Sequence, residues 1–258
     1  MDPDRLAQTA VEIGTVSPAA QPAVAEIVRD ANSDLGIKPR DVEASRVFLV
    51  KVLIDNSGSM GPPPDENLKI VTSVRKAMQQ LKDALNAAAR EADDCEILLS
   101  LDLLHGGQLQ PFARVEDCVG LSDENHTCDG NTPLINRAKQ LLGTMLAKVD
   151  EMSVSGRSAQ TFTVFISDGV ADDMAEVAVV KETIGGMTST KNHIVCGISI
   201  GGEATSTFVA MGIPQKWILA PDKDSFAFEQ AIKKVSRASR AASKGGARFQ
   251  SVATDGYR

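Results

Sequence analysis

The sequence is poor in aromatic residues, long apolar runs and excess basic charge. Only 4% of its 258 residues are aromatic whereas 43% are hydrophobic, so its core must be mainly aliphatic. No run approaches the roughly 18 apolar residues that a membrane-spanning helix needs. The formal charge of −7 gives no general case for binding nucleic acid. We therefore expect neither a membrane nor a nucleic acid as the partner.

Signals for export and for cysteine-based sites are also missing. Residues 1–5 lack the basic segment and the following apolar segment of a signal peptide, so we expect a cytoplasmic protein. In that compartment cysteines are expected to be free thiols rather than disulfides. No C-x-x-C pair and no G-x-x-x-x-G-K-[ST] loop occurs, which argues against a zinc ribbon and a nucleotide-binding P-loop. The four cysteines are Cys95, Cys118, Cys128 and Cys196.

What the sequence does contain is a buried-strand pattern that stops at a cluster of oxygen-bearing side chains. The apolar run 47–54 is rich in β-branched residues and leads directly into the sequence Asp-Asn-Ser-Gly-Ser. Ligands of open α/β sheets bind beyond the carboxyl ends of the strands. The D-x-S-x-S spacing lets Asp55, Ser57 and Ser59 point toward one place.

Two later stretches offer further oxygen atoms. Thr132 lies in a G-N-T-P-L loop at a predicted helix start, and Asp168 follows the apolar stretch 162–166 in an S-D-G turn. Oxygen ligands alone suit a hard cation, so we expect Mg²⁺, or Mn²⁺ or Ca²⁺ in its place. The opposing interpretation is that the two serines cap a helix and that the S-D-G sequence is an ordinary turn.

These three motifs, in this order, resemble the von Willebrand factor A (VWA) family with its metal-ion-dependent adhesion site (MIDAS). The resemblance covers residues 45–242. It implies that Ser57, Ser59 and Thr132 bind the cation directly, whereas Asp55 and Asp168 act through water. Such a cation keeps an open position, so the resemblance implies binding of a partner protein's aspartate or glutamate and no catalysis.

The order of predicted elements indicates one doubly wound α/β sheet with helices on both faces. We expect six strands, mostly parallel, with one antiparallel edge strand formed through a hairpin at Gly106-Gly107. The expected strands are 46–54, 96–104, 108–115, 161–167, 193–200 and 216–220. The expected helices of this domain are 66–92, 133–152, 174–184, 205–211 and 225–242, with Asp65 as the first N-cap and Gly185-Gly186 ending the third.

Segments on either side of this domain complete the expected organisation. Residues 1–44 form an N-terminal arm with one short helix over about 19–35, which either packs on the domain or docks a partner. Residues 243–258 form a flexible basic tail. The basic side chains of the last helix and tail suit either a solvated face or an acidic partner.

Four other patterns are open to functional interpretation. Gly197–Gly201 matches the G-x-S-x-G nucleophile elbow around Ser199, but all three histidines precede this serine, contrary to the hydrolase order. Cys118, His126 and Cys128 could hold zinc, although their spacing matches no zinc ribbon or finger. Asp172 and Asp173 are either outer groups of the metal site or solvated acids. Together with Asp123, Glu124 and Asp129 they would repel a generally acidic partner surface.

We expect a non-enzymatic protein-interaction module that is a monomer alone or a subunit of a hetero-complex. The sequences I-D-N-S-G-S-M and I-S-D-G-V-A-D-D most resemble the TerY-like bacterial VWA proteins. That resemblance implies a role in stress response, tellurite resistance or kinase–phosphatase signalling. The alternative is a hydrolase that uses the same cation, which would need a general base beside the metal.

Overall fold

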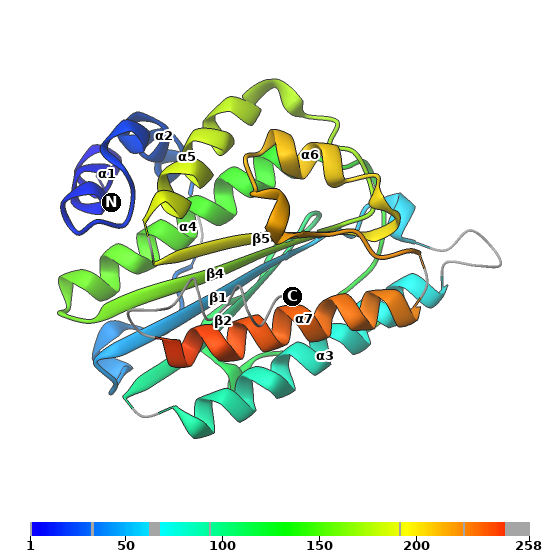
Figure 1. Cartoon of the computed structure of the whole chain (residues 1–258), viewed down its shortest axis with the longest axis horizontal. Helices are drawn as coiled ribbons and strands as arrows, with labels where there is room; N and C mark the ends of the chain where they lie inside the picture. Colours follow the sequence, from blue (N-terminus) through cyan, green and yellow to red (C-terminus); the bar gives the residue numbers. More distant parts are fainter. Residues whose placement is uncertain are drawn as a thin grey trace.

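A six-stranded sheet with the order β3-β2-β1-β4-β5-β6 forms the centre of the molecule (Figure 1). The computed structural model describes residues 2–31, 34–61, 68–92, 94–190, 192–223 and 225–245. All paired strands are parallel except β2 and β3, which confirms the predicted fold class. The strands are β1 (Arg46–Ile54), β2 (Cys95–Leu103), β3 (Gly107–Arg114), β4 (Ser158–Ser167), β5 (His193–Ser199) and β6 (Ile218–Leu219).

Strand β1 is central because its sequence can be buried on both faces. It pairs with β2 on one side and β4 on the other, and every residue from Val47 to Ile54 is buried. Lys51 is the polar exception. Its ammonium donates to Asp102 Oδ1 at 2.9 Å and to Ser100 Oγ at 3.0 Å, so the buried charge is paired. Burial lowers the pKa of Lys51, and the carboxylate of Asp102 opposes that shift.

Helices cover both faces of the sheet. Helices α3 and α7 pack against each other along one face, and α4 and α5 lie along the other (Figure 1). None of the helices, as far as the structure describes them, is both long and apolar enough to cross a membrane. The helices are α1 (Pro3–Glu12), α2 (Gln21–Asp30), α3 (Leu68–Glu91), α4 (Leu134–Val154), α5 (Val177–Ser189), α6 (Thr205–Ala210) and α7 (Ser225–Gly245).

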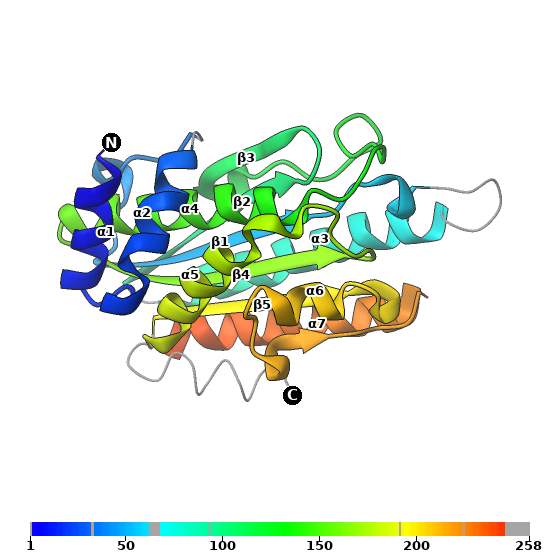
Figure 2. The ribbon, with the colours of Figure 1, turned by 90° about the horizontal axis from the view of Figure 1, so that it is seen from above.

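Helix α2 of the N-terminal arm packs on α4 and α5, and helix α1 packs on α2 and α4 (Figure 2). Lysines of α4 hold it electrostatically, because Lys139 pairs with Glu26 at 3.5 Å and the ammonium of Lys148 donates to the carbonyl of Ile37. Apolar side chains of α1 and α2, including Leu6 and Ile27, belong to the same hydrophobic core as the sheet. The packed interpretation of the arm therefore agrees with the structure.

Two parts of the sequence-based helix prediction are wrong. Helix α1 was not expected, yet it begins with Asp2 as N-cap and Pro3 in the first turn, a recognisable start signal. Helix α5 continues through Gly185-Gly186 to Ser189 instead of ending there. The reason is tertiary: a Cβ atom added to Gly186 would lie 2.3 Å from Ala20 Cβ, so glycine allows η1 (Pro18–Ala20) to approach α5 closely.

Several predicted boundaries differ from the observed ones. Strand β4 begins at Ser158, earlier than expected, and β6 contains only Ile218 and Leu219. Helix α7 extends to Gly245. The predicted N-cap Asp65 and the start of the predicted helix at residue 66 lie outside the described residues, as does the tail from residue 246. The division into 1–44, 45–242 and 243–258 stays a prediction.

Candidate metal site

The five predicted metal-binding residues lie at one edge of the sheet, where neighbouring parallel strands end. Ile54 of β1 is in register with Ile166 of β4, so Asp55 lies beside the chain that continues into Ser167 and Asp168. The backbone N–H of Asp55 donates to the carbonyl of Ile166 at 2.8 Å, which extends the pairing past the strand end. The pairing of β1 with β4 thereby fixes the distance between the D-x-S-x-S motif and the S-D-G motif.

The carboxylate of Asp55 shapes the loop that follows it. Oδ1 accepts from the backbone N–H of Ser57 at 2.8 Å, and Oδ2 accepts from the hydroxyl of Ser167. Asp55 is fully buried, so both oxygens are held by the protein rather than by bulk water. A carboxylate fixed in this way is suited to orient neighbouring ligands rather than to move.

The two serine hydroxyls face Asp168. Ser57 Oγ and Ser59 Oγ are 3.1 Å apart, and Ser59 Oγ donates to Asp168 Oδ1 at 2.7 Å. Ser57 precedes the short helix η3 (Gly58–Met60) but its side chain makes no capping hydrogen bond to it. The helix that the two serines would cap in the opposing interpretation is the one expected from residue 66, and its start lies outside the described residues.

Thr132 reaches the same place from the loop before α4. The loop is tied to the end of β1 because the N–H of Gly58 donates to the carbonyl of Gly130 at 3.0 Å. A Cβ atom built on Gly169 would lie 3.6 Å from Thr132 Oγ1 and 3.8 Å from Ser59 Oγ. Both hydroxyls thus border Gly169, directly after Asp168.

One oxygen of Asp168 has no hydrogen-bond partner although it is buried. The residue is 1% exposed, and its Oδ2 atom makes no hydrogen bond, whereas Oδ1 accepts from Ser59. Burial raises the pKa of Asp168; the hydrogen bond from Ser59 lowers it, and the carboxylate of Asp55 raises it further. A buried carboxylate oxygen without a hydrogen bond is costly unless a charge neutralises it, and the ammonium of Lys223 lies 3.9 Å from this oxygen. Three hydroxyls and two carboxylates at this position fit a hard, oxygen-binding cation.

The acidic residues after Asp168 have structural roles that the sequence did not reveal. Asp172 Oδ2 accepts from the N–H of Thr132 at 2.9 Å, and Asp173 accepts from the N–H groups of Ile135 and Asn136 at 3.0 and 2.8 Å. Asp173 therefore satisfies the N-terminus of α4, and Asp172 positions Thr132. Neither is simply a solvated acid, because each carboxylate accepts hydrogen bonds from the backbone at or before the start of α4.

Asn56 and His105 form a brace that was not singled out from the sequence. Asn56 Oδ1 accepts from the N–H of His105 at 2.7 Å, and its Nδ2 group donates to the carbonyl of Thr127 at 2.8 Å. The ring Nε2 of His105 lies 2.6 Å from the carbonyl oxygen of Asn131, so a histidine does lie in this loop cluster. Because that carbonyl can only accept a hydrogen bond, this nitrogen is a donor and is not free to act as a general base.

The nucleophile-elbow pattern does not form a hydrolase site. Ser199 is fully buried and its hydroxyl has no hydrogen-bond partner. The histidine on the same strand, His193, directs Nδ1 to the hydroxyl of Thr161 at 2.7 Å. A Cβ atom at Gly197 would lie 2.5 Å from the ring of Phe208, so this glycine makes room for core packing.

The cysteines do not form a metal site with His126. Within the described ranges, no group of three or more His, Cys, Asp or Glu side chains is arranged to hold a metal ion. All four cysteines are free thiols, and Cys118 Sγ lies 3.3 Å from the carbonyl oxygen of Arg114. Burial raises the pKa of Cys118 to about 11, so its thiol is protonated at neutral pH.

We expect the thermal melting temperature to be the same with and without reductant, because the four cysteines are unpaired thiols. The same should hold for the Cys118→Ser and Cys128→Ser double variant. Its stability should fall by no more than about 1–2 kcal/mol, since a serine at position 118 can donate to the same carbonyl. Differential scanning fluorimetry measures the melting temperatures, and denaturant unfolding measures the loss in the free energy of unfolding. A much larger loss in the double variant would indicate a zinc site or a disulfide.

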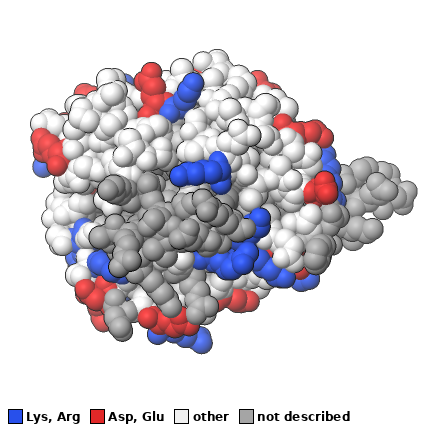
Figure 3. Space-filling view, viewed as in Figure 1, with Lys and Arg blue, Asp and Glu red and all other residues white. Residues whose placement is uncertain are grey.

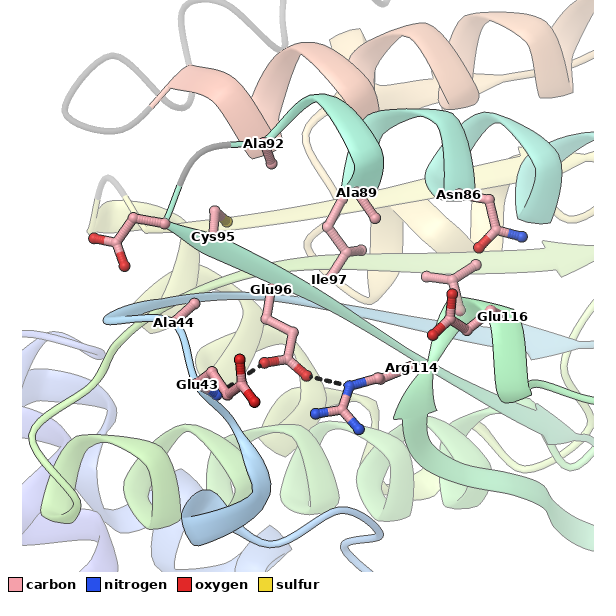
Figure 4. A pocket seen from close by; sticks show the side chains of 12 residues that line it. Glu43, Ala44, Asn86, Ala89, Ala92, Cys95, Glu96, Ile97, Arg114 and Glu116 are labelled. Carbon is pink, nitrogen blue, oxygen red and sulfur yellow. Dashed lines mark hydrogen bonds and ion pairs between the residues drawn. The ribbon is translucent and has the colours of Figure 1, made fainter.

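Two cavities lie outside the cluster of predicted ligands. One of about 630 Å³ is lined by Arg75, His126 and Cys128, among others, beside the loop before Thr132. The other, of about 410 Å³, lies at the opposite end of β2 (Figure 4). Its Glu96 carboxylate accepts from Arg114 Nε at 2.8 Å and from the N–H of Glu43 at 3.2 Å, so this acid is used internally.

Charged side chains of both signs occupy the face seen in Figure 3, with lysines and arginines over α7. Lys233 and Arg237 of α7 are exposed, whereas Glu229 of α7 is paired with Lys76 of α3 at 2.6 Å. The side chains of Arg240 and Lys244 lie outside the described set. The basic helix is thus partly a docking surface for α3 and partly solvated.

Comparison with known proteins gives similarity in structure only. No protein-family model and no curated protein matches the chain. The pilus adhesin SpaC from Lactobacillus rhamnosus GG is similar over 81% of this chain and 32% of its own, with 12% identity and a TM-score of 0.53. A von Willebrand factor type A structure from Catenulispora acidiphila matches over 78% and 44%, with 13% identity and a TM-score of 0.47.

A third solved structure is proximal thread matrix protein 1 from the mussel byssus, described with a zinc-occupied MIDAS motif. It matches over 75% of this chain and 45% of its own, with 10% identity and a TM-score of 0.46. The chain therefore spans less than half of the length of each of these three proteins. At such low identities the similarity concerns the fold alone.

Proposed function

We propose that the chain is a non-enzymatic VWA module that binds a carboxylate of a partner protein through a divalent cation. In this proposal the hydroxyls of Ser57, Ser59 and Thr132 bind the cation directly, and the carboxylates of Asp55 and Asp168 hold its water ligands. Mg²⁺ is the first candidate because every donor is an oxygen atom, and Mn²⁺ or Ca²⁺ could replace it.

The observation that carries the proposal is the buried Oδ2 atom of Asp168, which has no hydrogen-bond partner. The Oδ1 atom of Asp168 accepts a hydrogen bond from Ser59, whose hydroxyl oxygen lies 3.1 Å from that of Ser57. A cation at this place would neutralise the Asp168 carboxylate, and the neutral hydroxyls would leave most of the cation's charge uncompensated. Such a cation attracts an aspartate or glutamate from outside.

Binding is favoured over hydrolysis by the state of the nearby side chains. His105, the histidine beside the loop of Thr132, directs Nε2 to a backbone carbonyl oxygen. Ser199 is buried without a histidine at hydrogen-bonding distance. Neither the Nε2 atom of His105 nor a histidine beside Ser199 is therefore available as a general base for a hydrolase that uses the same cation.

The cellular setting is a separate part of the proposal and derives from the motif resemblance to TerY-like bacterial proteins. We propose a cytoplasmic module, monomeric alone or joined to a hetero-complex, in a stress-response or tellurite-resistance system. Fractionation of cells expressing the natural gene tests the compartment, and recovery in the exported fraction would contradict it. Growth on tellurite with and without the gene tests the pathway.

We expect the complex with a natural partner to dissociate in EDTA and to re-form with Mg²⁺. Thr132→Ala should prevent its formation because one direct hydroxyl ligand is lost, whereas Ser199→Ala should leave it intact. Affinity purification of the tagged full chain from its native cells, with each variant in parallel, measures this. Binding that survives both EDTA and Thr132→Ala would place the contact on another surface, such as the arm or α7.

A further inference from the structure

Lys223 extends from the segment between β6 and α7 to the candidate metal site. Its Nζ atom lies 3.9 Å from Asp168 Oδ2 and 3.2 Å from Glu203 Oε1. The Asp168 side chain is 1% exposed, whereas those of Lys223 and Glu203 are 44% and 61% exposed. The ammonium is therefore located between one buried and one solvated carboxylate.

Gly201, in the turn after β5, leaves the space in which the side chain of Lys223 lies. A Cβ atom on Gly201 would lie 2.4 Å from Lys223 Cε and 2.7 Å from its Cγ, so any side chain there would displace the lysine stem. Gly201 also has a φ of +75°, and its N–H donates to the carbonyl of Pro221 at 2.7 Å. The turn and the segment before α7 are thus held together, with the lysine stem across the turn.

The carboxylates of the other acids near the site accept hydrogen bonds from neutral groups. Asp55 accepts from Ser57 and Ser167, while Asp172 and Asp173 accept from backbone N–H groups before and within α4. Among the described residues, Lys223 is the basic side chain that forms an ion pair with one of the five predicted metal-binding residues. A divalent cation near Asp168 would therefore meet this ammonium as a competing positive charge.

We propose that Lys223 is the resident counter-cation of the site: in the metal-free protein Asp168 and Glu203 share it, and when a divalent cation is bound it leaves Asp168 and keeps Glu203 alone. This inference rests on the proposed metal site and describes its regulation. Like charges a few ångströms apart repel strongly where water is partly excluded, so Asp168 cannot serve both cations equally well. Glu203, already 3.2 Å from the ammonium, is the alternative partner.

Two variants with opposite expected signs test the inference. Lys223→Met removes the competing ammonium, so Mn²⁺ should bind about tenfold more tightly, equivalent to about 1.4 kcal/mol. Glu203→Gln removes the alternative partner, so Mn²⁺ should bind several-fold more weakly. In the Lys223→Met background, Glu203→Gln should have much less effect, because its role is to accept Lys223. Isothermal titration of the full chain with Mn²⁺ alone measures all four proteins.

Matched controls separate a local exchange from a change in net charge. Lys216→Met and Glu182→Gln alter exposed residues elsewhere and should change the Mn²⁺ affinity by less than twofold, and thermal melts should show that every variant is folded. Unchanged or weaker Mn²⁺ binding by Lys223→Met would overturn the role of Lys223, as would an equal gain in affinity in Lys216→Met. In either case, Mn²⁺ binding by the wild type would still support the metal site. No Mn²⁺ binding by any protein, wild type included, would overturn the metal site itself.

Discussion

Replacing Asp55 with alanine is expected to weaken the binding of Mg²⁺ and Mn²⁺ by about 10- to 100-fold. The buried carboxylate fixes the N–H of Ser57 and the hydroxyl of Ser167, so its removal disorders the loop that presents the serine ligands. It also removes one of the two negative charges that attract the cation. Isothermal titration calorimetry measures the affinity directly.

The same variant should remain folded, with a loss of about 1–3 kcal/mol for the buried groups left unpaired. Asp55→Asn is the closer probe of charge, because its amide oxygen can still accept from Ser57, and we expect it to weaken metal binding with a smaller loss of stability. Ser199→Ala, at the end of the next-but-one strand, is the control and should bind metal as the wild type does. Unchanged affinity in both Asp55 variants would remove Asp55 from the site.

Two adjacent glycines of α5 are expected to respond in opposite ways to alanine. Gly186 is buried against Ala20, and a Cβ atom there would lie 2.3 Å from Ala20 Cβ, so Gly186→Ala must push the N-terminal arm outward. We expect a loss of about 1–3 kcal/mol in the free energy of unfolding. Gly185 has no atom within 4 Å of the corresponding position, so Gly185→Ala should stabilise the helix by up to about 1 kcal/mol.

Denaturant unfolding of the two variants beside the wild type measures this contrast. Hydrogen exchange shows where the structure is loosened, because amide exchange in Gly186→Ala should become faster mainly in α1 and α2. If both alanine variants gained stability, the arm would not be held against α5 as the structure has it. Equal destabilisation by both would indicate that these glycines serve helix α5 itself and not the contact with the arm.

The sheet and the candidate ligands could be predicted because both depend on local patterns. An apolar run that ends in a carboxylate identifies the strand β1 and places Asp55 at its carboxyl end, and parallel pairing then brings Asp168 beside it. Ser57 and Ser59 follow from the same strand end through the D-x-S-x-S spacing, whereas Thr132 follows from the order of the three motifs.

The parts that escaped prediction depend on contacts between distant segments. Gly185-Gly186 resembles a helix end, and only the packing of Ala20 explains why the helix continues. Asp173 resembles a solvated acid, and only its contact with the start of α4 reveals a cap. Lys223 carries no motif at all, and its role depends on a turn glycine and a strand end that lie far away in the sequence.

The most direct test of the metal site is the crystal structure of the full chain grown with Mn²⁺, with diffraction data collected near the manganese absorption edge. The account predicts one anomalous peak bordered by the hydroxyls of Ser57, Ser59 and Thr132, with water between it and the carboxylates of Asp55 and Asp168. The ammonium of Lys223 should then lie farther than 3.9 Å from Asp168 Oδ2 while it keeps its contact with Glu203. A peak at other residues only, or none at saturating Mn²⁺ with these side chains arranged as they are here, would contradict the account.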